Sequence, residues 1–242
     1  MKFINVVFIH GIGGNKVYAH KTMYQNLQDA LGPEYLINAL PVRYLKAINQ
    51  NQEENFDIMY SGKDKKWLKI LKKLRNAFLN SFGDAVSIYH DKETYRRVML
   101  EIDKALKQAA MNEHPTIVIS QSLGCQLFSC YMYDAAKRNY YSEQQKSVNL
   151  WISTGCNIRA FTHGLSFRKI HAFFPPNKDF KWLNFWNWGD IMGYPMRTLS
   201  PSYHSLITKD IHVGGGLPIL SHTKYDESNK VIKNIVKAIK AL

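Results

Sequence analysis

Short apolar runs alternate with longer amphipathic stretches along most of the chain. The first run, Phe3 to Ile9, is almost continuously apolar, which is typical of a strand buried on both faces of a parallel sheet. Comparable runs follow at Leu36–Leu40, Ile117–Ile119, Val148–Ser153 and Phe180–Trp186, with a weaker one around Leu206–Val213. The pattern therefore predicts a series of mostly buried strands.

The stretches between these runs have the spacing of amphipathic helices. Asp91 is placed to cap a helix whose apolar positions form a steady stripe from Tyr95 to Ala109. Further helices are predicted up to Leu31, after the turn that follows Ile119, and over 230–242. Strands that alternate with helices form a parallel sheet covered on both faces. The chain is therefore predicted to be an α/β protein, and no linker or internal repeat divides it.

Residues 63–82 predict a helix of a different kind. Apolar side chains from Trp67 to Phe82 recur at helical spacing, while lysines and one arginine crowd the other positions. This basic helix, Lys63 to Phe82, suits a lid or a contact with an anionic membrane surface. It also suits a helix packed on the sheet with a solvated outer face. The polar stretch 45–62 before it is expected to be a surface excursion, so that a lid or helical insertion occupies about 45–90.

Length and charge limit the function without choosing one. A chain of 242 residues suits a single domain, and its apolar runs are far shorter than the roughly 20 residues of a membrane span. The net charge of +13 permits contact with anionic membranes or nucleic acid. Neither paired Cys/His fingers nor an RNP motif is present, so no nucleic-acid binding is expected.

The N-terminus and the cysteines favour a cytoplasmic location. Met1 to Asn5 leads directly into the first strand without a cleavage-site pattern, so no signal peptide is expected. Cys125, Cys130 and Cys156 cannot all pair with one another and lie in core-like segments. Reduced thiols are therefore the simplest interpretation.

The strand Ile117–Ile119 runs into a turn of small and polar residues, Ser120-Gln121-Ser122-Leu123-Gly124. A helical pattern follows at once. Strand, tight turn and helix in this order are typical of a nucleophile elbow, in which the central serine projects from the turn. Ser120 replaces the first glycine of the usual Gly-x-Ser-x-Gly pattern. The alternative interpretation is a polar turn between a buried strand and a helix.

The first strand ends in a glycine-rich loop, His10-Gly11-Ile12-Gly13-Gly14. Glycines let a loop turn sharply and present its backbone N–H groups. Such a loop can cradle a phosphate or supply part of an oxyanion hole. The spacing matches neither phosphate-binding pattern, whereas a His-Gly pair after the first strand suits an oxyanion hole. A plain turn between strand and helix is the remaining alternative.

A serine nucleophile needs a base beside it and a third group that fixes the base. Ligands bind beyond the carboxyl ends of the strands in an open parallel sheet. Ser122, Asp190 and His222 all follow predicted strands, in the chain order serine, aspartate, histidine. His204 and His212 are rival bases. Asp179 stands at the wrong end of its strand, and Asp210 is a weaker alternative acid.

Taken together, these motifs resemble the α/β-hydrolases, in particular the lipase- and esterase-like serine hydrolases. The features that match are the His10-Gly14 loop, the elbow around Ser122, the strand end Ser153-Thr154-Gly155, Asp190 and His222. The resemblance implies a mostly parallel sheet with helices on both faces, reduced at its N-terminal end.

The resemblance also assigns roles to single residues. It implies Ser122 as nucleophile, His222 as general base and Asp190 as the acid that orients it. Oxyanion donors would be the backbone N–H groups of Ile12 and Leu123. Residues of the glycine-rich loop would contact the substrate, namely His10, Gly11 and Gly13. No metal and no cofactor is implied.

The expected activity is hydrolysis of a carboxylic ester, with a small-molecule ester or lipid as substrate. If the Lys63–Phe82 helix is a lid, lipid esters are favoured. A thioesterase or peptidase could use the same three residues, because a fold does not determine a substrate. A catalytically silent scaffold is the alternative from another class. It would bind anionic membranes or acidic partners through the basic helix.

Overall fold

A computed structural model describes residues 1–11, 20–44, 91–162, 164–214 and 220–242. Three sequence predictions lie outside the described residues: the Lys63–Phe82 helix, the 45–62 excursion before it, and the part of the glycine-rich loop from Ile12 to Gly14.

The strands form one parallel sheet in the order β2-β1-β3-β4-β5-β6. They are β1 Lys2–Ile9, β2 Tyr35–Pro41, β3 Thr116–Gln121, β4 Val148–Thr154, β5 Lys181–Trp186 and β6 Lys209–His212. The central strands are buried almost throughout, because helices cover both faces of the sheet. Every strand predicted from an apolar run is confirmed, including the weak run that contains β6.

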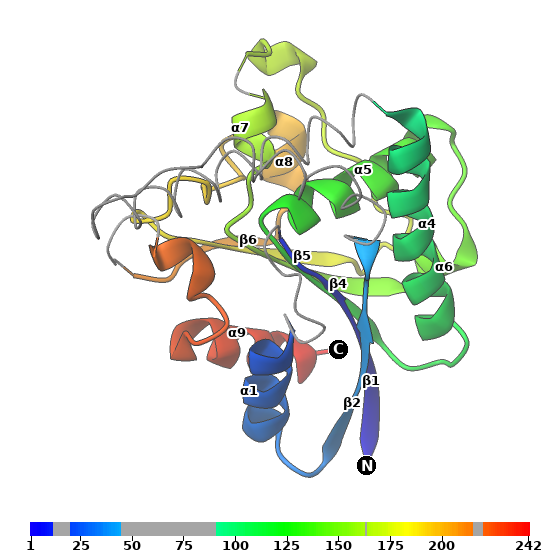
Figure 1. Ribbon diagram of the computed structural model, residues 1–242, viewed down its shortest axis with the longest axis vertical. Helices are drawn as coiled ribbons and strands as arrows, with labels where there is room; N and C mark the ends of the chain where they lie inside the picture. The colour runs from blue at the N-terminus through cyan, green and yellow to red at the C-terminus, as the bar shows by residue number, and fades with distance from the viewer. Residues whose placement is uncertain (12–19, 45–90, 163, 215–219) are drawn as a thin grey trace, which may run out of the picture.

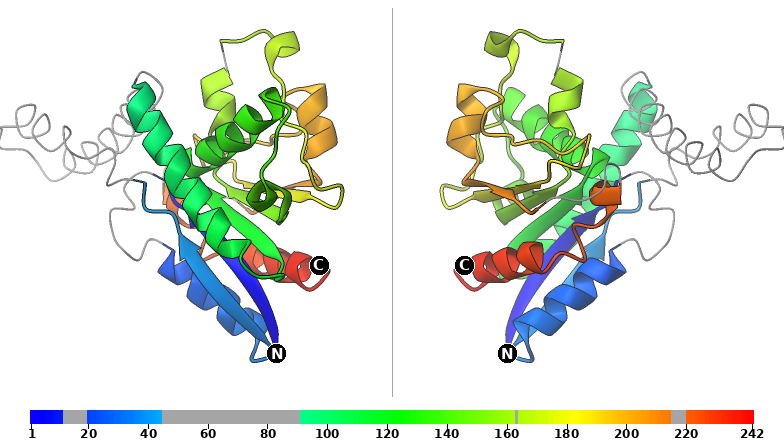
Figure 2. Two further views of the ribbon diagram at one scale, coloured as in Figure 1. Left: turned by 90° about the vertical axis from the view of Figure 1, so that its right-hand side faces the viewer. Right: turned by 90° about the vertical axis from the view of Figure 1, so that its left-hand side faces the viewer.

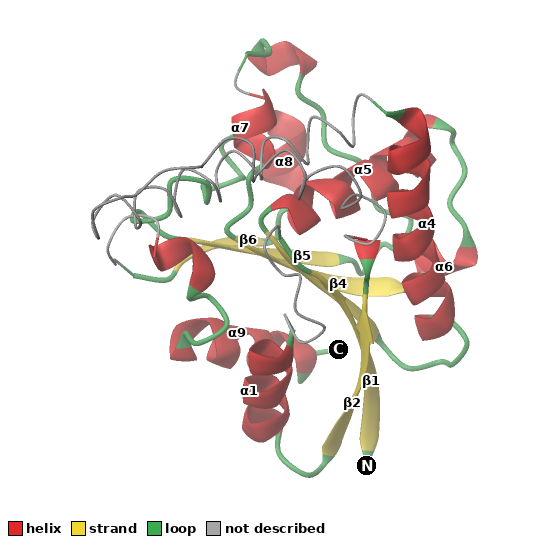
Figure 3. Ribbon diagram, viewed as in Figure 1, coloured by secondary structure: helices red, strands yellow, loops and turns green. Residues whose placement is uncertain are grey.

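The helices are divided unequally between the two faces of the sheet (Figures 1 and 2). On one face lie α1 Lys21–Leu31 and α9 Asn229–Ile239, which pack against each other. The other face carries α4 Lys92–Ala109, α5 Leu123–Lys137, α6 Glu143–Lys146, α7 Ile158–Thr162 and α8 Pro201–Leu206. Short 3₁₀ turns occur at η2 Phe167–Lys169 and η3 Leu220–Thr223. Figure 3 shows the resulting sandwich of a sheet between two helical layers, as predicted.

Helix ends follow the capping residues in the sequence. The Asp91 carboxylate accepts the backbone N–H groups of Glu93 and Thr94, which confirms it as the cap of α4. The Ser200 and Ser228 hydroxyls accept backbone N–H groups at the starts of α8 and α9. These caps fix where the helices begin, and so fix the loops that precede them.

Two apolar clusters stabilise the sheet, one on each face. The larger cluster contains Trp151, Trp182 and Phe128, all completely buried. Cys125, Cys130 and Cys156 form no disulfide. None of the helices in the described ranges combines the length and the apolar character needed to cross a membrane.

A row of polar side chains crosses the sheet within the larger cluster. Ser120, Ser153, Asn184 and Asp210 are register partners on β3 to β6. Ser153 donates to Asn184 at 2.8 Å, and Asn184 donates to Asp210 at 2.7 Å. A buried polar group is costly unless it is hydrogen-bonded. Ser153, Asn184 and Asp210 bond one another, and Ser120 bonds Ile152 O and the Trp151 indole, so the row is tolerated in the core.

Two stacked tryptophans are tied to this row. The indole N–H of Trp151 donates to Ser120 Oγ at 2.7 Å, and that of Trp182 donates to Ser153 Oγ at 2.8 Å. Their ring centroids are 3.8 Å apart. Ser120 therefore has a structural reason to replace the usual glycine, because its hydroxyl is the acceptor for a buried indole.

We predict that Ser120→Ala lowers the free energy of unfolding by about 1–3 kcal/mol, because the Trp151 indole loses its acceptor. In a Trp151→Phe background, which has no indole donor, the same substitution should cost about 1 kcal/mol less. Urea unfolding followed by circular dichroism in the four variants of this cycle measures the difference. Equal losses in both backgrounds would show that the Ser120–Trp151 bond contributes nothing.

Candidate active site

Ser122 occupies the turn between β3 and α5 in a strained conformation. Its φ of 52° and ψ of −122° lie in a region that a non-glycine residue rarely adopts. Its backbone N–H donates to Thr154 O at 3.0 Å, which ties the turn to the end of the neighbouring strand β4. A Cβ on Gly124 would lie 2.2 Å from Ile9 O, so α5 can begin there only with glycine. These features are those of the predicted elbow.

The described part of the His-Gly loop lies directly against this serine. A Cβ on Gly11 would come within 2.8 Å of Ser122 Cβ, so only glycine allows the loop to approach so closely. Ile12 and Gly13, the other two loop residues predicted for the site, lie outside the described residues. Among the predicted oxyanion donors only Leu123 is described, and it is the first residue of α5.

His10 is held in one orientation at the end of β1. Its ring stacks on Tyr44 with centroids 4.9 Å apart, and the Tyr44 hydroxyl donates to His10 O at 2.7 Å. Its Nδ1 lies 2.7 Å from Gly11 O, and because a carbonyl only accepts, Nδ1 carries the proton. Burial lowers the pKa of His10 despite this bond. The ring is therefore neutral near pH 7 and lies beside Gly11.

Asp190 and His222 are brought together from segments 32 residues apart. His222 Nδ1 lies 2.8 Å from Asp190 Oδ1 and 2.9 Å from Oδ2. Asp190 follows β5, and its side chain is fully buried. His222 lies on η3, and its side chain is 20% exposed. A carboxylate accepts, so Nδ1 carries a proton and Nε2 is the ring nitrogen left to act as a base.

The Asp190 carboxylate has two further donors. The Tyr225 hydroxyl donates to Oδ2 at 2.7 Å, and the backbone N–H of Met192 donates to Oδ1 at 2.8 Å. Burial by itself would raise the pKa of Asp190. The bond and charge of His222, with the two other donors, outweigh burial and lower the pKa below its usual value. Asp190 is therefore ionised at neutral pH.

His222 is also connected to the elbow through its backbone. The Gln121 side-chain amide, one residue before Ser122, donates to His222 O at 3.0 Å. No hydrogen bond within the described ranges joins the Ser122 hydroxyl to His222. The structure thus brings Asp190 to His222, and the backbone of His222 to the residue next to Ser122.

Two glycines make room for this arrangement. A Cβ on Gly155, at the end of β4, would lie 2.9 Å from both Asp190 Oδ2 and His222 Nδ1. A Cβ on Gly193 would lie 2.5 Å from Asp190 Oδ2 and 2.8 Å from the Tyr225 hydroxyl. Gly155 also has a φ of 56°, which favours glycine. The acid and the base are enclosed closely enough that a methyl group does not fit.

The rival acids and bases are engaged elsewhere. The Asp210 carboxylate accepts from Asn184 and from the backbone N–H groups of Met196 and Arg197, so it serves the polar row and the following loop. His212, at the end of β6, packs against the ring of Trp186 on β5. His204 lies on α8, with Nε2 3.2 Å from Arg197 Nη2, and Asp179 lies at the N-terminal end of β5 and is exposed.

Sequence reasoning missed three contributors, namely Tyr225, Gln121 and Gly193. Tyr225 stands three residues after His222, and Gln121 directly precedes Ser122. Gln121 belongs to the predicted elbow, but nothing in the pattern indicates where its amide or the Tyr225 hydroxyl will point. The need for glycine at position 193 becomes clear only from its contacts with Asp190 and Tyr225.

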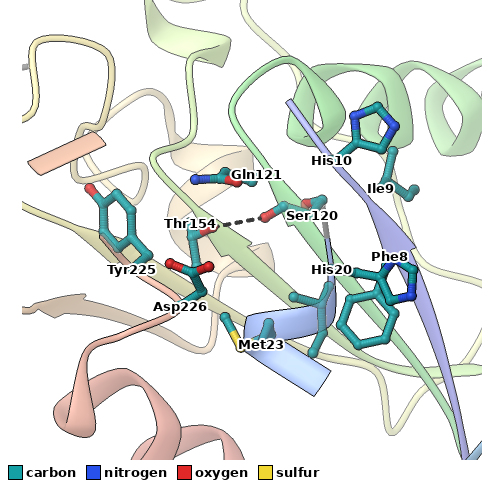
Figure 4. Close-up of a pocket in the computed structure, with 11 residues that line it drawn as sticks. Phe8, Ile9, His10, His20, Met23, Ser120, Gln121, Thr154, Tyr225 and Asp226 are labelled. Carbon is teal, nitrogen blue, oxygen red and sulfur yellow. Dashed lines mark hydrogen bonds between the residues drawn. The ribbon is translucent and has the colours of Figure 1, made fainter. Parts of the chain in front are cut away.

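A cavity of about 40 Å³ lies beside the site, at the carboxyl ends of β1, β3 and β4. In Figure 4, Gln121 and Tyr225 lie at one end of it and His20 and Phe8 at the other, with the Thr154 hydroxyl bonded to Ser120 O between them. That volume holds only a few water molecules, whereas pockets for organic ligands are typically about 300–1,000 Å³. The cavity that the described residues form is therefore of a size for water molecules.

The residues described contain no cluster of three or more His, Cys, Asp or Glu side chains that could hold a metal ion.

Comparison with known proteins identifies the fold. No protein-family model matches the chain, and no curated protein matches it. The match to the crystal structure of esterase PE8 has 13% sequence identity and a TM-score of 0.50. It spans 100% of this chain and 93% of the esterase chain. The match to a structure from work on the metagenome-derived lipolytic enzymes LipS and LipT has 9% sequence identity and also a TM-score of 0.50. It spans 100% of this chain and 95% of the other chain. The chain therefore has the α/β-hydrolase fold, as the motifs predict.

We predict that Gly193→Ala lowers the free energy of unfolding by about 1–3 kcal/mol, because the methyl group collides with Asp190 and Tyr225. Gly164→Ala is the matched control, since a Cβ there meets nothing within 4 Å. It should change stability by less than about 0.5 kcal/mol. Urea unfolding of both variants tests this, and equal effects would mean that the acid site tolerates an added methyl group.

Asp190 should also stabilise the fold in a pH-dependent way. Because its folded pKa is lowered, its contribution is present above the pKa of an unfolded aspartate, about 3.9, and is lost as the pH falls through the folded value. The stability difference between wild type and Asp190→Asn should therefore be largest at neutral pH and shrink below about pH 4. Urea unfolding from neutral to acidic pH measures it. A difference that grows on acidification would contradict the lowered pKa.

Proposed function

We propose that this chain, which has the α/β-hydrolase fold, hydrolyses carboxylic esters through an acyl-enzyme on Ser122. One observation carries the proposal: the His222 Nδ1–H···Asp190 bond of 2.8 Å leaves Nε2 as the base, at the sheet edge where Ser122 is held at a φ of 52°. A histidine fixed by an ionised carboxylate activates a serine by taking its proton. Asp190 is the orienting acid in this scheme.

The chemistry runs in two halves. His222 Nε2 takes the proton of Ser122 as its oxygen attacks the ester carbonyl, and the imidazolium returns that proton to the leaving alcohol. Water then attacks the acyl-enzyme, with Nε2 again accepting a proton that passes back to Ser122 as the acid is released. Asp190 stabilises the imidazolium and stays ionised throughout. The serine–histidine hydrogen bond of such sites is often long without substrate and tightens in the complex.

The negative charge on the carbonyl oxygen needs donors. Leu123 is the first residue of α5, and an N–H in the first turn of a helix has no partner within the helix. The helix N-terminus adds a partial positive charge near Ser122. With the N–H of Ile12, which the family resemblance implies as second donor, this group forms the oxyanion hole. A single donor of this kind is typically worth about 2.7–4 kcal/mol.

The ester class of substrate is supported by the fold neighbours, one an esterase and the others lipolytic enzymes by name. Substrate contacts come from His10 and Gly11, which lie beside Ser122, and from Gly13 of the same loop. His10 is neutral near pH 7 because burial lowers its pKa. Its uncharged ring beside the elbow favours a neutral ester group over an anionic one.

The test is labelling with a fluorophosphonate probe, located by mass spectrometry. Ser122 of the wild type should be labelled, and Ser122→Ala should not react. Ser205→Ala is the control, because Ser205 is an exposed serine of α8 bonded to Pro201 O, and it should label like wild type. His222→Ala should slow labelling by at least about 100-fold, as expected when a general base is lost. Folded wild type that does not label would reject the proposal in favour of a silent scaffold.

A further inference from the structure

We infer that Tyr225 is a positioning residue for the acid of this site: its hydroxyl holds the Asp190 carboxylate in the one orientation that serves His222. The inference rests on the proposed function and adds a fourth side chain to Ser122, His222 and Asp190. Tyr225 touches no reacting atom in this scheme, so it acts through Asp190 and not on the substrate.

The Asp190 carboxylate has a donor on each of its two oxygens. Oδ2 accepts the Tyr225 hydroxyl at 2.7 Å, and Oδ1 accepts the Met192 N–H at 2.8 Å. His222 Nδ1 lies almost equally far from both oxygens, at 2.8 and 2.9 Å. One fixed donor on each oxygen stops the carboxylate from rotating about its terminal bond. The two oxygens therefore face His222 together.

Tyr225 belongs to the same short segment of the chain as His222. It lies three residues after His222, just beyond η3, so the segment that carries the base is bonded to Asp190 twice. Two bonds between the same two segments fix a distance and also an angle. Losing the hydroxyl would leave His222 attached to the acid at a single point.

Tyr225 is buried, and its ring and its hydroxyl have different surroundings. Tyr225 is 2% exposed and its ring belongs to the apolar cluster on the α1–α9 side of the sheet. A buried hydroxyl needs a partner, and Asp190 is the partner found. Burial raises the pKa of Tyr225, and the nearby charge of Asp190 raises it further, so the phenol is protonated and donates at neutral pH. The ring packs the core, while the hydroxyl alone reaches the acid.

This separation of roles gives the test. Tyr225→Phe keeps the ring and removes only the donor. The Asp190 charge is then less spread by hydrogen bonding and favours the protonated form of His222 more strongly. The acidic limb of the pH profile, which reports protonation of the base in the free enzyme, should move upward by about 0.5 unit. The maximal labelling rate should fall about tenfold, since the imidazole is held less firmly.

The experiment measures the second-order rate of fluorophosphonate labelling at Ser122 against pH. Tyr194→Phe is the matched control, because that hydroxyl donates to Ile191 O in the same loop and not to the acid. It should leave both rate and profile unchanged. Circular dichroism confirms that each variant is folded. If Tyr225→Phe does not fold, the profile is recorded on Tyr225→Met, which also removes the hydroxyl donor and leaves the residues around Asp190 otherwise unchanged.

A slower rate together with an upward shift of the acidic limb supports the inference. An unchanged acidic limb overturns it, whatever the rate, because a tyrosine that only packs the core would not alter protonation of His222. Failure of the wild type to label rejects the proposed function itself, and the inference with it. The two failures are thus distinguished by the wild-type result.

Discussion

The site depends on one buried negative charge. Asp190 is 3% exposed, and an unpaired carboxylate at that depth would be strongly destabilising. It is tolerated because His222, Tyr225 and the Met192 N–H all point at it. Satisfying this charge draws together the turn after β5 and the η3 segment, which are far apart in sequence. The geometry that the proposed mechanism requires is therefore also the geometry that satisfies the buried charge of Asp190.

Close backbone approach is the second constraint, and it is met by glycine. Gly124 lets α5 begin against the end of β1, and Gly11 lets the loop after β1 touch Ser122. Gly155 and Gly193 do the same around Asp190. All four lie at the carboxyl edge of the sheet, where parallel strands deliver their loops.

The sequence predicts the framework well and the contacts between distant segments poorly. Strands such as β1 and β3 are evident because apolar runs mark burial on both faces. The sequence could also propose Ser122, Asp190 and His222 for one edge of the sheet, because each follows a predicted strand. The Tyr225–Asp190 and Gln121–His222 bonds span 35 and 101 residues. Their partners depend on side-chain direction, which periodicity does not encode. Ser120 shows the same limit, since its partner Trp151 is 31 residues away.

The choice between two neighbouring carboxylates shows how structure adds to chemical reasoning. Asp190 and Asp210 come from adjacent strands, β5 and β6, and both accept several hydrogen bonds. The donors found on Asp210 are an amide side chain and backbone N–H groups, which cannot change protonation state, so that carboxylate can only hold structure. Asp190 is bonded to an imidazole whose other nitrogen faces away from the acid. The nature of the donors, rather than the number of bonds, is therefore the reason that we propose Asp190 and not Asp210 as the acid of the site.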